Sequence, residues 1–168
     1  SYMNYMIRRL FSCCKKSKRN DNHKEVYVLQ LENNKYYVGE SFMKDKRIQD
    51  HKDHMGSAWT KKHKVIQEMK PLTKPQETFW ELYETLEMIY IYGIENVRGS
   101  LFTTPYNLKE SEKIMAAQLY CELHNLCRKC GGNDHFITQC KREEPERWVT
   151  NFGGLLSLIE KRLCQDCG

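Results

Sequence analysis

The sequence predicts an α+β fold, because segments with the character of strands come first and long helical patterns follow them. Residues 26–39 contain two runs of branched and aromatic side chains around the turn Asn33-Asn34, which indicates a β-hairpin that Gly39 ends. Residues 76–92 and 108–126 place apolar side chains at three- and four-residue steps, which indicates two amphipathic helices. We therefore expect a small sheet in the first part of the chain and helices after it.

Breaks and caps divide the chain into elements. Gly39, Gly56 and Pro71 separate the first ones, Gly93 is suited to end a helix, and Asn107 is suited to begin the next. In chain order, the expected elements are the strands 26–31 and 35–38, a short solvated helix over 43–54, the strand 64–69, the helices 76–92 and 108–126, and an apolar helix from Leu155 to Leu163.

The basic character of the chain is confined to its first segment. The formal net charge is +5, but residues 1–24 hold seven Lys or Arg against one Asp and carry +6, which leaves −1 for the remainder. Such a basic arm is typical of a nucleic-acid tail or a localisation signal, and we expect it to be disordered. Cys13-Cys14 beside a run of lysines also resembles a palmitoylation site next to a polybasic patch, which would give weak membrane association.

Four residues near the C-terminal end have the spacing C-x2-C-x4-H-x4-C, namely Cys127, Cys130, His135 and Cys140. Three thiolates and one imidazole are a complete tetrahedral ligand set for structural zinc, with no position left for water. A segment of fourteen residues is too short to bury a core, so zinc would supply its folding free energy, on the order of 10 kcal/mol. Buried free thiols are the alternative, but the glycine-rich stretch before the histidine predicts a turn.

The other cysteines leave alternatives open. Cys121 and His124, one helical turn before the zinc segment, are either a rival ligand pair or ordinary residues of a helix face. Cys164 and Cys167 are either half of a second zinc site or a pair of free thiols. Zinc-type spacing without a signal peptide predicts an intracellular, reducing compartment. No apolar run approaches the 18 or more residues of a transmembrane helix.

A second group of polar residues lies in the first part of the chain. Tyr27 and Tyr37 face each other across the predicted hairpin, and Arg47 and His51 are four residues apart, so they share one face of the following helix. The next helix carries Glu81, Glu84 and Glu87. These residue types suit phosphodiester hydrolysis: a phenol or imidazole can deprotonate water, a guanidinium can stabilise phosphate charge, and a carboxylate can hold a divalent ion.

Each of these residues also has an ordinary structural explanation. Tyrosines are common packing residues in strands, and an arginine and a histidine at this spacing occur on solvated helix faces. Glutamates on a helix keep it soluble. It is the order of the residues along the chain that favours a site.

That order resembles the GIY-YIG endonuclease superfamily. Val26-Tyr27 stands where the GIY motif of the family ends, and Tyr37-Val38-Gly39 stands where YIG lies. The run 46–51 resembles the family helix that carries an invariant arginine followed four residues later by a histidine. Residues 56–60 and 92–99 resemble a subgroup found in large DNA viruses and some protists, in which a zinc knuckle often follows the nuclease domain. Glu25 stands in place of the family's first glycine.

The resemblance covers residues 25–100 and implies a three-stranded antiparallel sheet flanked by helices. It also implies hydrolysis of a DNA strand with one metal ion. By position, Tyr27 would be the general base, assisted by Tyr37. Arg47 would bind the scissile phosphate, and His51 would contact the phosphate or protonate a group near it.

The resemblance also implies that a glutamate of the helix 76–92 holds the catalytic ion, Mg²⁺ or Mn²⁺. The position that family members use is occupied by Thr85 in this chain. Glu81 lies one turn earlier on the same face and is expected to serve, ahead of Glu84 and then Glu87. If none of them serves, the chain would bind DNA without cutting it.

The segment 127–140 resembles a retroviral-type zinc knuckle, in which unpaired bases lie on exposed apolar or aromatic side chains. By this resemblance, Phe136 and Ile137 would be the platform for bases, and Arg128 and Lys129 would contact phosphates. The alternative is a knuckle that only pins the preceding helix or binds protein.

The sequence therefore predicts an endonuclease that acts on DNA, with single-stranded or branched nucleic acid as further ligands, in the cytoplasm, the nucleus or a viral factory. The rivals are a non-catalytic nucleic-acid-binding protein and a zinc-dependent interaction protein held at a membrane. The expected organisation is a basic arm (1–24), a nuclease-like domain (25–100), a connecting helix (107–126), a zinc knuckle (127–140) and a helical tail (141–168).

Overall fold

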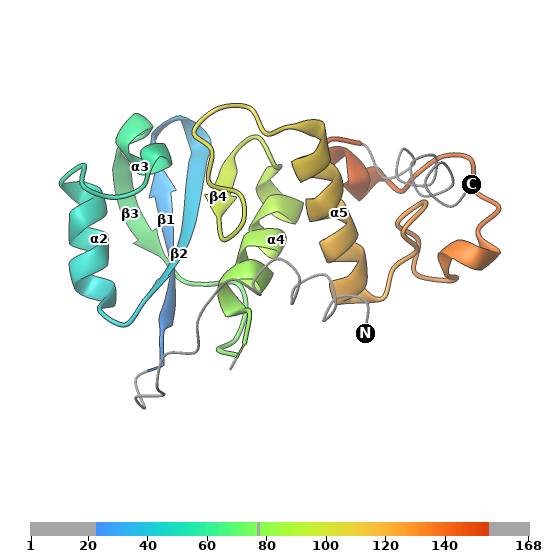
Figure 1. The fold of residues 1–168 in the computed structure, drawn as a ribbon, viewed down its shortest axis with the longest axis horizontal. Coiled ribbons are helices and arrows are strands. Elements are labelled where there is room, and N and C mark those ends of the chain that lie inside the picture. Colours follow the sequence, from blue (N-terminus) through green and yellow to red (C-terminus); the bar gives the residue numbers. More distant parts are fainter. Residues whose placement is uncertain (1–22, 77, 155–168) are drawn as a thin grey trace.

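The computed structural model describes residues 23–76 and 78–154, and it contains a four-stranded mixed sheet, seen in the left half of Figure 1. The strand order in the sheet is β3-β1-β2-β4. The strands are β1 (Glu25–Leu31), β2 (Lys35–Ser41), β3 (Val65–Met69) and β4 (Val97–Gly99). Helices lie beside this sheet, so the predicted α+β class is confirmed.

The predicted hairpin is formed by β1 and β2. A single turn of 3-10 helix, η1 (Glu32–Asn34), joins the two strands, and its Asn33 and Asn34 have left-handed φ values of 61° and 55°. Asparagine adopts this backbone more readily than most residues, because its short polar side chain can bond to the local backbone. The Asn-Asn pair is therefore an effective turn signal.

The prediction of three antiparallel strands is wrong, because β4 adds a fourth strand. β1 pairs antiparallel with both β2 and β3, but β4 runs parallel to β2 and sets Arg98 opposite Tyr37. A strand of three residues is too short to show a periodic pattern. A parallel neighbour also needs a long connection, and no local signal in the sequence announces where that connection ends.

The helices of the described residues agree in part with the predicted ones. They are α2 (Lys44–Lys52), α3 (Ala58–Lys62), α4 (Trp80–Tyr92) and α5 (Glu110–His124), with the 3-10 segments η2 (Ile137–Gln139) and η3 (Arg147–Phe152). α2, α4 and α5 are shorter versions of predicted helices, whereas α3 was not predicted. The predicted helix 155–163, the arm up to residue 22, and the cysteines at 13, 14, 164 and 167 lie outside the described residues.

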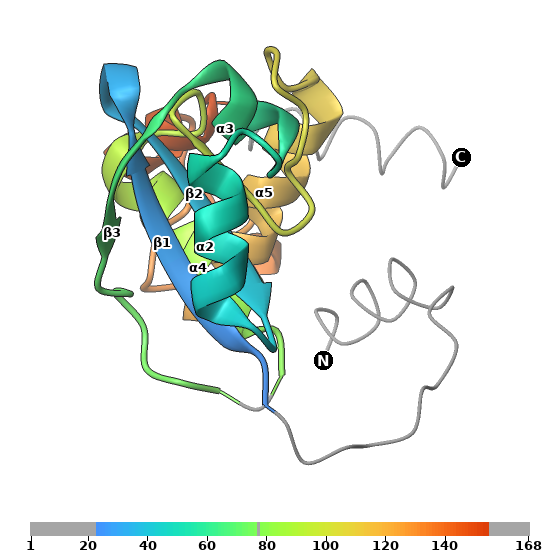
Figure 2. The same cartoon turned by 90° about the vertical axis from the view of Figure 1, so that its left-hand side faces the viewer.

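Helices cover both faces of the sheet, as Figure 2 shows. α2 and α3 lie on the face where side chains of β1 form a buried cluster with Ile48 and Trp59. α4 lies on the opposite face, and α5 and η3 pack beyond it, so that Tyr120, Val149 and Phe152 extend the same core. The chain therefore returns to the core after the cysteine-rich segment. No helix within the described residues has the length and apolar character needed to span a membrane.

Candidate functional site

Tyr27 and Tyr37 lie close together on the face of the sheet that α2 and α3 cover, with their ring centroids 6.3 Å apart. The hairpin register sets Tyr27 opposite Gly39. A Cβ atom on Gly39 would lie 2.4 Å from the Tyr27 hydroxyl. Glycine is needed at position 39 because the Tyr27 ring occupies the space of a side chain there.

His51 joins the two tyrosines from α2. It is 1% exposed, its Nε2 lies 2.9 Å from the Tyr27 hydroxyl, and its Nδ1 lies 2.7 Å from the Thr60 hydroxyl. Its ring centroid lies 4.7 Å from that of Tyr37. A Cβ atom on Gly56 would lie 2.0 Å from His51 Nδ1. Gly56, which lies between α2 and α3, therefore also leaves space for the His51 imidazole.

The hydrogen bonds around Thr60 fit one tautomer of His51. With the Thr60 hydroxyl proton donated to the Ser57 carbonyl at 3.1 Å, the Thr60 oxygen accepts a hydrogen bond from His51 Nδ1. His51 Nε2 then accepts from the Tyr27 hydroxyl. Burial, and then the charge of Arg47, lower the pKa of His51 to about 4, so the imidazole is neutral at pH 7. Tyr27 therefore donates a hydrogen bond to a neutral base.

Arg47 lies one helical turn before His51 and adjoins the Tyr27 hydroxyl. Burial raises the pKa of Tyr27 and Tyr37 adds to this effect, whereas Arg47 opposes it through its charge and a hydrogen bond. The Arg47 side chain remains 40% exposed, with Asp50 at 3.9 Å. A partly exposed guanidinium beside a buried phenol is suited to bind a phosphate from solvent.

Glu81, in the first turn of α4, completes the group. Burial, and then the Glu40 carboxylate, raise the pKa of Glu81 to about 7, whereas the Ser100 backbone N–H, 3.2 Å from its Oε1, lowers it. The charge of Glu81 in turn raises the pKa of Tyr27 and of Tyr37. The Ser100 N–H that binds Glu81 follows β4, which pairs with β2 at Tyr37. Carboxylate oxygen is the ligand that Mg²⁺ and Mn²⁺ prefer.

The two other candidate glutamates are engaged elsewhere. Glu84 is fully buried, and its two carboxylate oxygens accept hydrogen bonds from the backbone N–H groups of Leu72 and Thr73 and from the Thr73 hydroxyl. Glu87 pairs with His124 of α5. The structure therefore brings only Glu81 of the three to the tyrosines, and Glu84 instead anchors the segment that follows β3.

Sequence reasoning missed three residues of this site: Ser57, Thr60 and Glu40. Gly56-Ser57 predicts a break and residues 56–60 resemble a subgroup of the family, but neither signal gives Ser57 or Thr60 a role. In the structure Ser57 caps α3 by accepting a hydrogen bond from the Thr60 N–H at 3.2 Å, and this cap presents the Thr60 hydroxyl to His51.

The shifted pKa values of His51 and Glu81 predict opposing effects of pH on stability. His51 binds a proton less readily when folded, so acid destabilises the folded state between about pH 6.5 and 4. Glu81 binds a proton more readily when folded, so acid stabilises the folded state between about pH 7 and 4.5. Each group contributes on the order of 3 kcal/mol to the free energy of unfolding over its range.

We therefore expect these two effects to cancel in the wild type and to separate in single variants. Glu81→Gln should lose stability steadily as the pH falls from 7 to 5, whereas His51→Gln should gain it. Urea denaturation at three pH values across this range measures both trends against the wild type. Parallel pH dependences in all three proteins would contradict the assignment.

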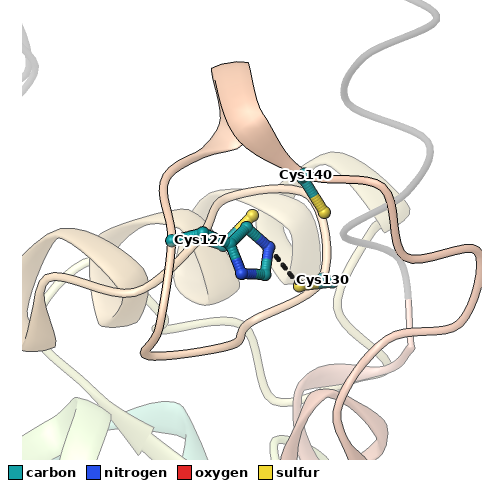
Figure 3. A group of neighbouring side chains, drawn as sticks. Cys127, Cys130 and Cys140 are labelled. Atoms are coloured by element: carbon teal, nitrogen blue, oxygen red, sulfur yellow. Dashed lines mark hydrogen bonds between the residues drawn. The ribbon is translucent and has the colours of Figure 1, made fainter.

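The four predicted zinc ligands come together in the structure (Figure 3). One ligand atom each from Cys127, Cys130, His135 and Cys140 lies within 4.8 Å of the others. Zinc–sulfur bonds of about 2.3 Å in a tetrahedron place sulfur atoms roughly 3.8 Å apart, so the cluster has the size and the donor set that zinc requires. The residues present therefore fit a structural zinc ion.

Neighbouring residues orient the histidine of this cluster. His135 Nδ1 lies 2.7 Å from an oxygen of Asp134, and Arg142 in turn contacts Asp134 at 3.2 Å. His135 Nε2 is left facing the Cys130 sulfur at 3.4 Å. A carboxylate on the far ring nitrogen is the usual means of fixing the orientation of a metal-binding histidine.

The zinc segment is docked on η3 through Gly131 and Trp148. Gly131 has a left-handed φ of 78°, and a Cβ atom there would lie 2.6 Å from the Trp148 ring. The Trp148 indole N–H donates to the Gly131 carbonyl at 3.0 Å. The Glu146 N–H donates to the Cys130 carbonyl at 2.7 Å. These contacts join the zinc segment to the main core.

Three of the four residues predicted to contact nucleic acid in the segment 127–140 line one cavity, and Lys129 does not. Phe136 is 61% exposed, and with Ile137 and Arg128 it lines a cavity of about 260 Å³. Arg128 also lies 3.5 Å from Glu122, and Lys129 is half-buried. An exposed phenyl ring beside a guanidinium is compatible with the stacking of a base.

The rival ligand pair Cys121 and His124 does not join the zinc cluster. Cys121 is fully buried, and its thiol donates to the Cys127 carbonyl at 3.6 Å. His124 pairs with Glu87. Both residues therefore serve the packing of α5.

Comparisons with protein-family models, with curated proteins and with solved structures gave no match to this chain.

Proposed function

We propose that this chain is a metal-dependent endonuclease of the GIY-YIG type that hydrolyses a phosphodiester bond of DNA, with the zinc knuckle assisting nucleic-acid binding. The observation that supports the proposal is the hydrogen bond from the Ser100 N–H to Glu81 at 3.2 Å, because Ser100 follows β4, the strand that pairs with β2 at Tyr37. The charge of Glu81 also raises the pKa of Tyr27 and of Tyr37. A lone carboxylate suffices to hold a hydrated Mg²⁺ or Mn²⁺ ion, because such ions keep several waters. The bound ion would stabilise phosphate charge and make a coordinated water more acidic.

The Tyr27–His51 pair supports removal of a proton from the attacking water. Tyr27 alone is a poor base, because its raised pKa keeps the phenol protonated at pH 7. As the Tyr27 oxygen takes a proton from water, it passes its own proton to Nε2 of neutral His51. The water oxygen bonds to phosphorus, the bond from phosphorus to the leaving oxygen breaks, and that oxygen takes a proton from solvent. In this mechanism His51 acts on Tyr27 and does not touch the phosphate.

Arg47 is the residue suited to hold the phosphate, since its guanidinium is partly exposed and adjoins Tyr27. Its two parallel N–H groups match the geometry of phosphate oxygens and would stabilise the negative charge that grows in the transition state.

A plasmid-nicking assay with Mg²⁺ or Mn²⁺ tests the proposal. We expect Arg47→Ala to lower the rate by about 10²–10³-fold, because it removes a charge that acts on the transition state. Lys46→Ala, an exposed neighbour on the same helix, is the matched control and should cut at close to the wild-type rate. Absence of nicking by the wild type with either ion would reject catalysis, and retained DNA binding would then favour the non-catalytic alternative.

A further inference from the structure

A second cluster of basic residues lies outside the candidate active site. Lys35, Lys62 and Arg98 line a cavity of about 180 Å³ whose walls include the rings of Trp59 and Tyr106. Arg98 stacks on Trp59 at 4.4 Å from the ring centroid, and the Lys62 ammonium lies 5.3 Å from the centroid of Tyr106. The loop that follows β4 forms one wall, because it runs beside α3 (Figure 2).

None of these three cations forms an ion pair with another described residue. Arg98 is 1% exposed, and its guanidinium donates four hydrogen bonds to backbone carbonyls. The carbonyls that accept from it are those of Ile94, Val97, Thr104 and Tyr106. Arg98 thus brings a buried positive charge to the cavity wall. Burial lowers the pKa of Arg98, and the charges of Glu95 and Glu112 oppose this effect without forming an ion pair with it among the described residues.

Each of the two lysine ammonium groups uses only some of its three hydrogen-bond donors. The Lys35 ammonium donates to Asn96 Oδ1 at 2.7 Å and to the Glu95 carbonyl at 3.4 Å, and Lys62 donates to the Pro105 carbonyl at 3.1 Å. An ammonium group has three donors, which leaves one on Lys35 and two on Lys62. The carboxylate of Glu95, the one acidic side chain on the cavity wall, is paired with Lys113.

His63 adds a buried polar atom to the same wall. It is 8% exposed, it packs edge-on against Trp59 at 4.6 Å, and its Nδ1 is buried without a hydrogen-bond partner. Burial, followed by the charges of Lys35 and Lys62, lowers the pKa of His63, whereas Glu32 opposes them. An unpaired buried nitrogen and uncompensated cations are both unfavourable unless an anion satisfies them.

The cavity adjoins the candidate active site. Lys35 and Tyr37 are two residues apart on β2, so they share one face and lie about 7 Å apart along the strand. Arg98 is the β4 neighbour of Tyr37. On α3, Thr60 contacts His51 while Trp59 faces the cavity, so one short helix forms a wall of both sites.

We propose that this cavity binds a phosphate group of the nucleic-acid backbone, next to the phosphate that Arg47 would hold. The inference rests on the proposed nucleic-acid function but not on catalysis. Lys35 and Lys62 supply the hydrogen bonds, and Arg98 supplies a fixed charge. A second phosphate held on the same sheet face sets the direction in which the strand crosses the tyrosines.

Fluorescence anisotropy of labelled duplex DNA with the zinc-loaded full chain, without added Mg²⁺, tests this site. Neutralising one phosphate contributes about one to the slope of log affinity against log salt concentration. We expect the Lys35→Gln/Lys62→Gln double variant to bind about tenfold more weakly and to reduce that slope by about one. Lys61→Gln/Lys64→Gln removes two exposed charges from the same region outside the cavity and is the matched control.

Equal affinity and slope in the two double variants would overturn the proposal, and so would a wild-type protein that binds no DNA. A reduced salt slope in the Lys35→Gln/Lys62→Gln variant, together with a wild type that does not nick DNA, would support this phosphate site and reject the endonuclease. Titration with inorganic phosphate, monitored through the NMR signals of the His63 ring, distinguishes a free phosphate ion from a phosphate of the DNA backbone as the ligand. Phosphate-dependent shifts together with unchanged DNA binding in the cavity variant would assign the cavity to a free anion instead and overturn the proposal.

Discussion

Replacement of Glu81 by glutamine is expected to abolish DNA cleavage, with a loss of at least about 10³-fold in the nicking rate. Of the three candidate glutamates, it is the carboxylate that lies beside the tyrosines, and glutamine keeps its size while removing the charge that a divalent ion needs. DNA binding in the absence of Mg²⁺ should persist, because Arg47 and the segment 127–140 are unchanged.

The pH dependence of cleavage gives this prediction a second readout. Because the pKa of Glu81 is raised to about 7, protons compete with the metal ion below neutrality. At limiting Mg²⁺, the rate should rise about tenfold per pH unit below 7 and level off above it, and saturating Mg²⁺ should move this rise to lower pH.

Glu87→Gln is the matched control, since it makes the same change six residues later on the same helix, where the carboxylate pairs with His124. Its nicking rate should remain close to that of the wild type. A fully active Glu81→Gln protein would remove the proposed metal site, whatever the outcome for Arg47→Ala.

Loss of zinc is expected to unfold the segment 127–140, because its folding depends on metal binding worth on the order of 10 kcal/mol. Cys130→Ser should lower the zinc content by one ion per chain and make this segment the first site of limited proteolysis. The damage should reach η3, since Trp148 packs on Gly131 and donates to its carbonyl.

Cys121→Ala is the control for this experiment, because Cys121 is a buried thiol six residues from Cys127 that takes no part in the cluster. It should retain the wild-type zinc content. Equal zinc contents of wild type and Cys130→Ser, or zinc loss on substitution of Cys121 alone, would show that the ligand set has been assigned wrongly. Mass spectrometry under native conditions measures the content directly.

The features that the sequence predicts correctly are those carried by local pattern. The hairpin depends on alternation and an Asn-Asn turn, α4 and α5 depend on helical periodicity, and the cysteine cluster depends on spacing within fourteen residues. Each of these signals lies within one stretch of chain. For that reason no knowledge of the tertiary structure was needed to recognise them.

The features that the sequence does not predict are those decided by distant neighbours. β4 forms by pairing with the edge of β2, which is distant in the sequence. α3 is a helix of only five residues, and Ser57 caps it. Glu81 and Glu84 are three residues apart and chemically identical. Only the segment after β3, which binds the Glu84 carboxylate, distinguishes them.

The role of His51 depends on the same kind of information. Its spacing from Arg47 indicates a shared helix face, and the family resemblance implies that His51 contacts the phosphate or protonates a group near it. The structure instead places Thr60 and Tyr27 on its two ring nitrogens, one from α3 and one from β1. No pattern within α2 encodes these partners.

One helix joins the two ends of the molecule. α4 carries Glu81 in its first turn and Tyr90 in its last turn, and the Tyr90 ring lies 6.4 Å from that of Trp148. Glu81 and Tyr90 are nine positions apart, which corresponds to roughly 14 Å along an α-helix, and a helix bends little over that length. The helix is therefore a strut of fixed length, with the carboxylate at one end and the support of the zinc segment at the other. Nucleic acid that contacts both would meet two binding sites at a fixed distance, unlike the sites of two flexibly linked domains.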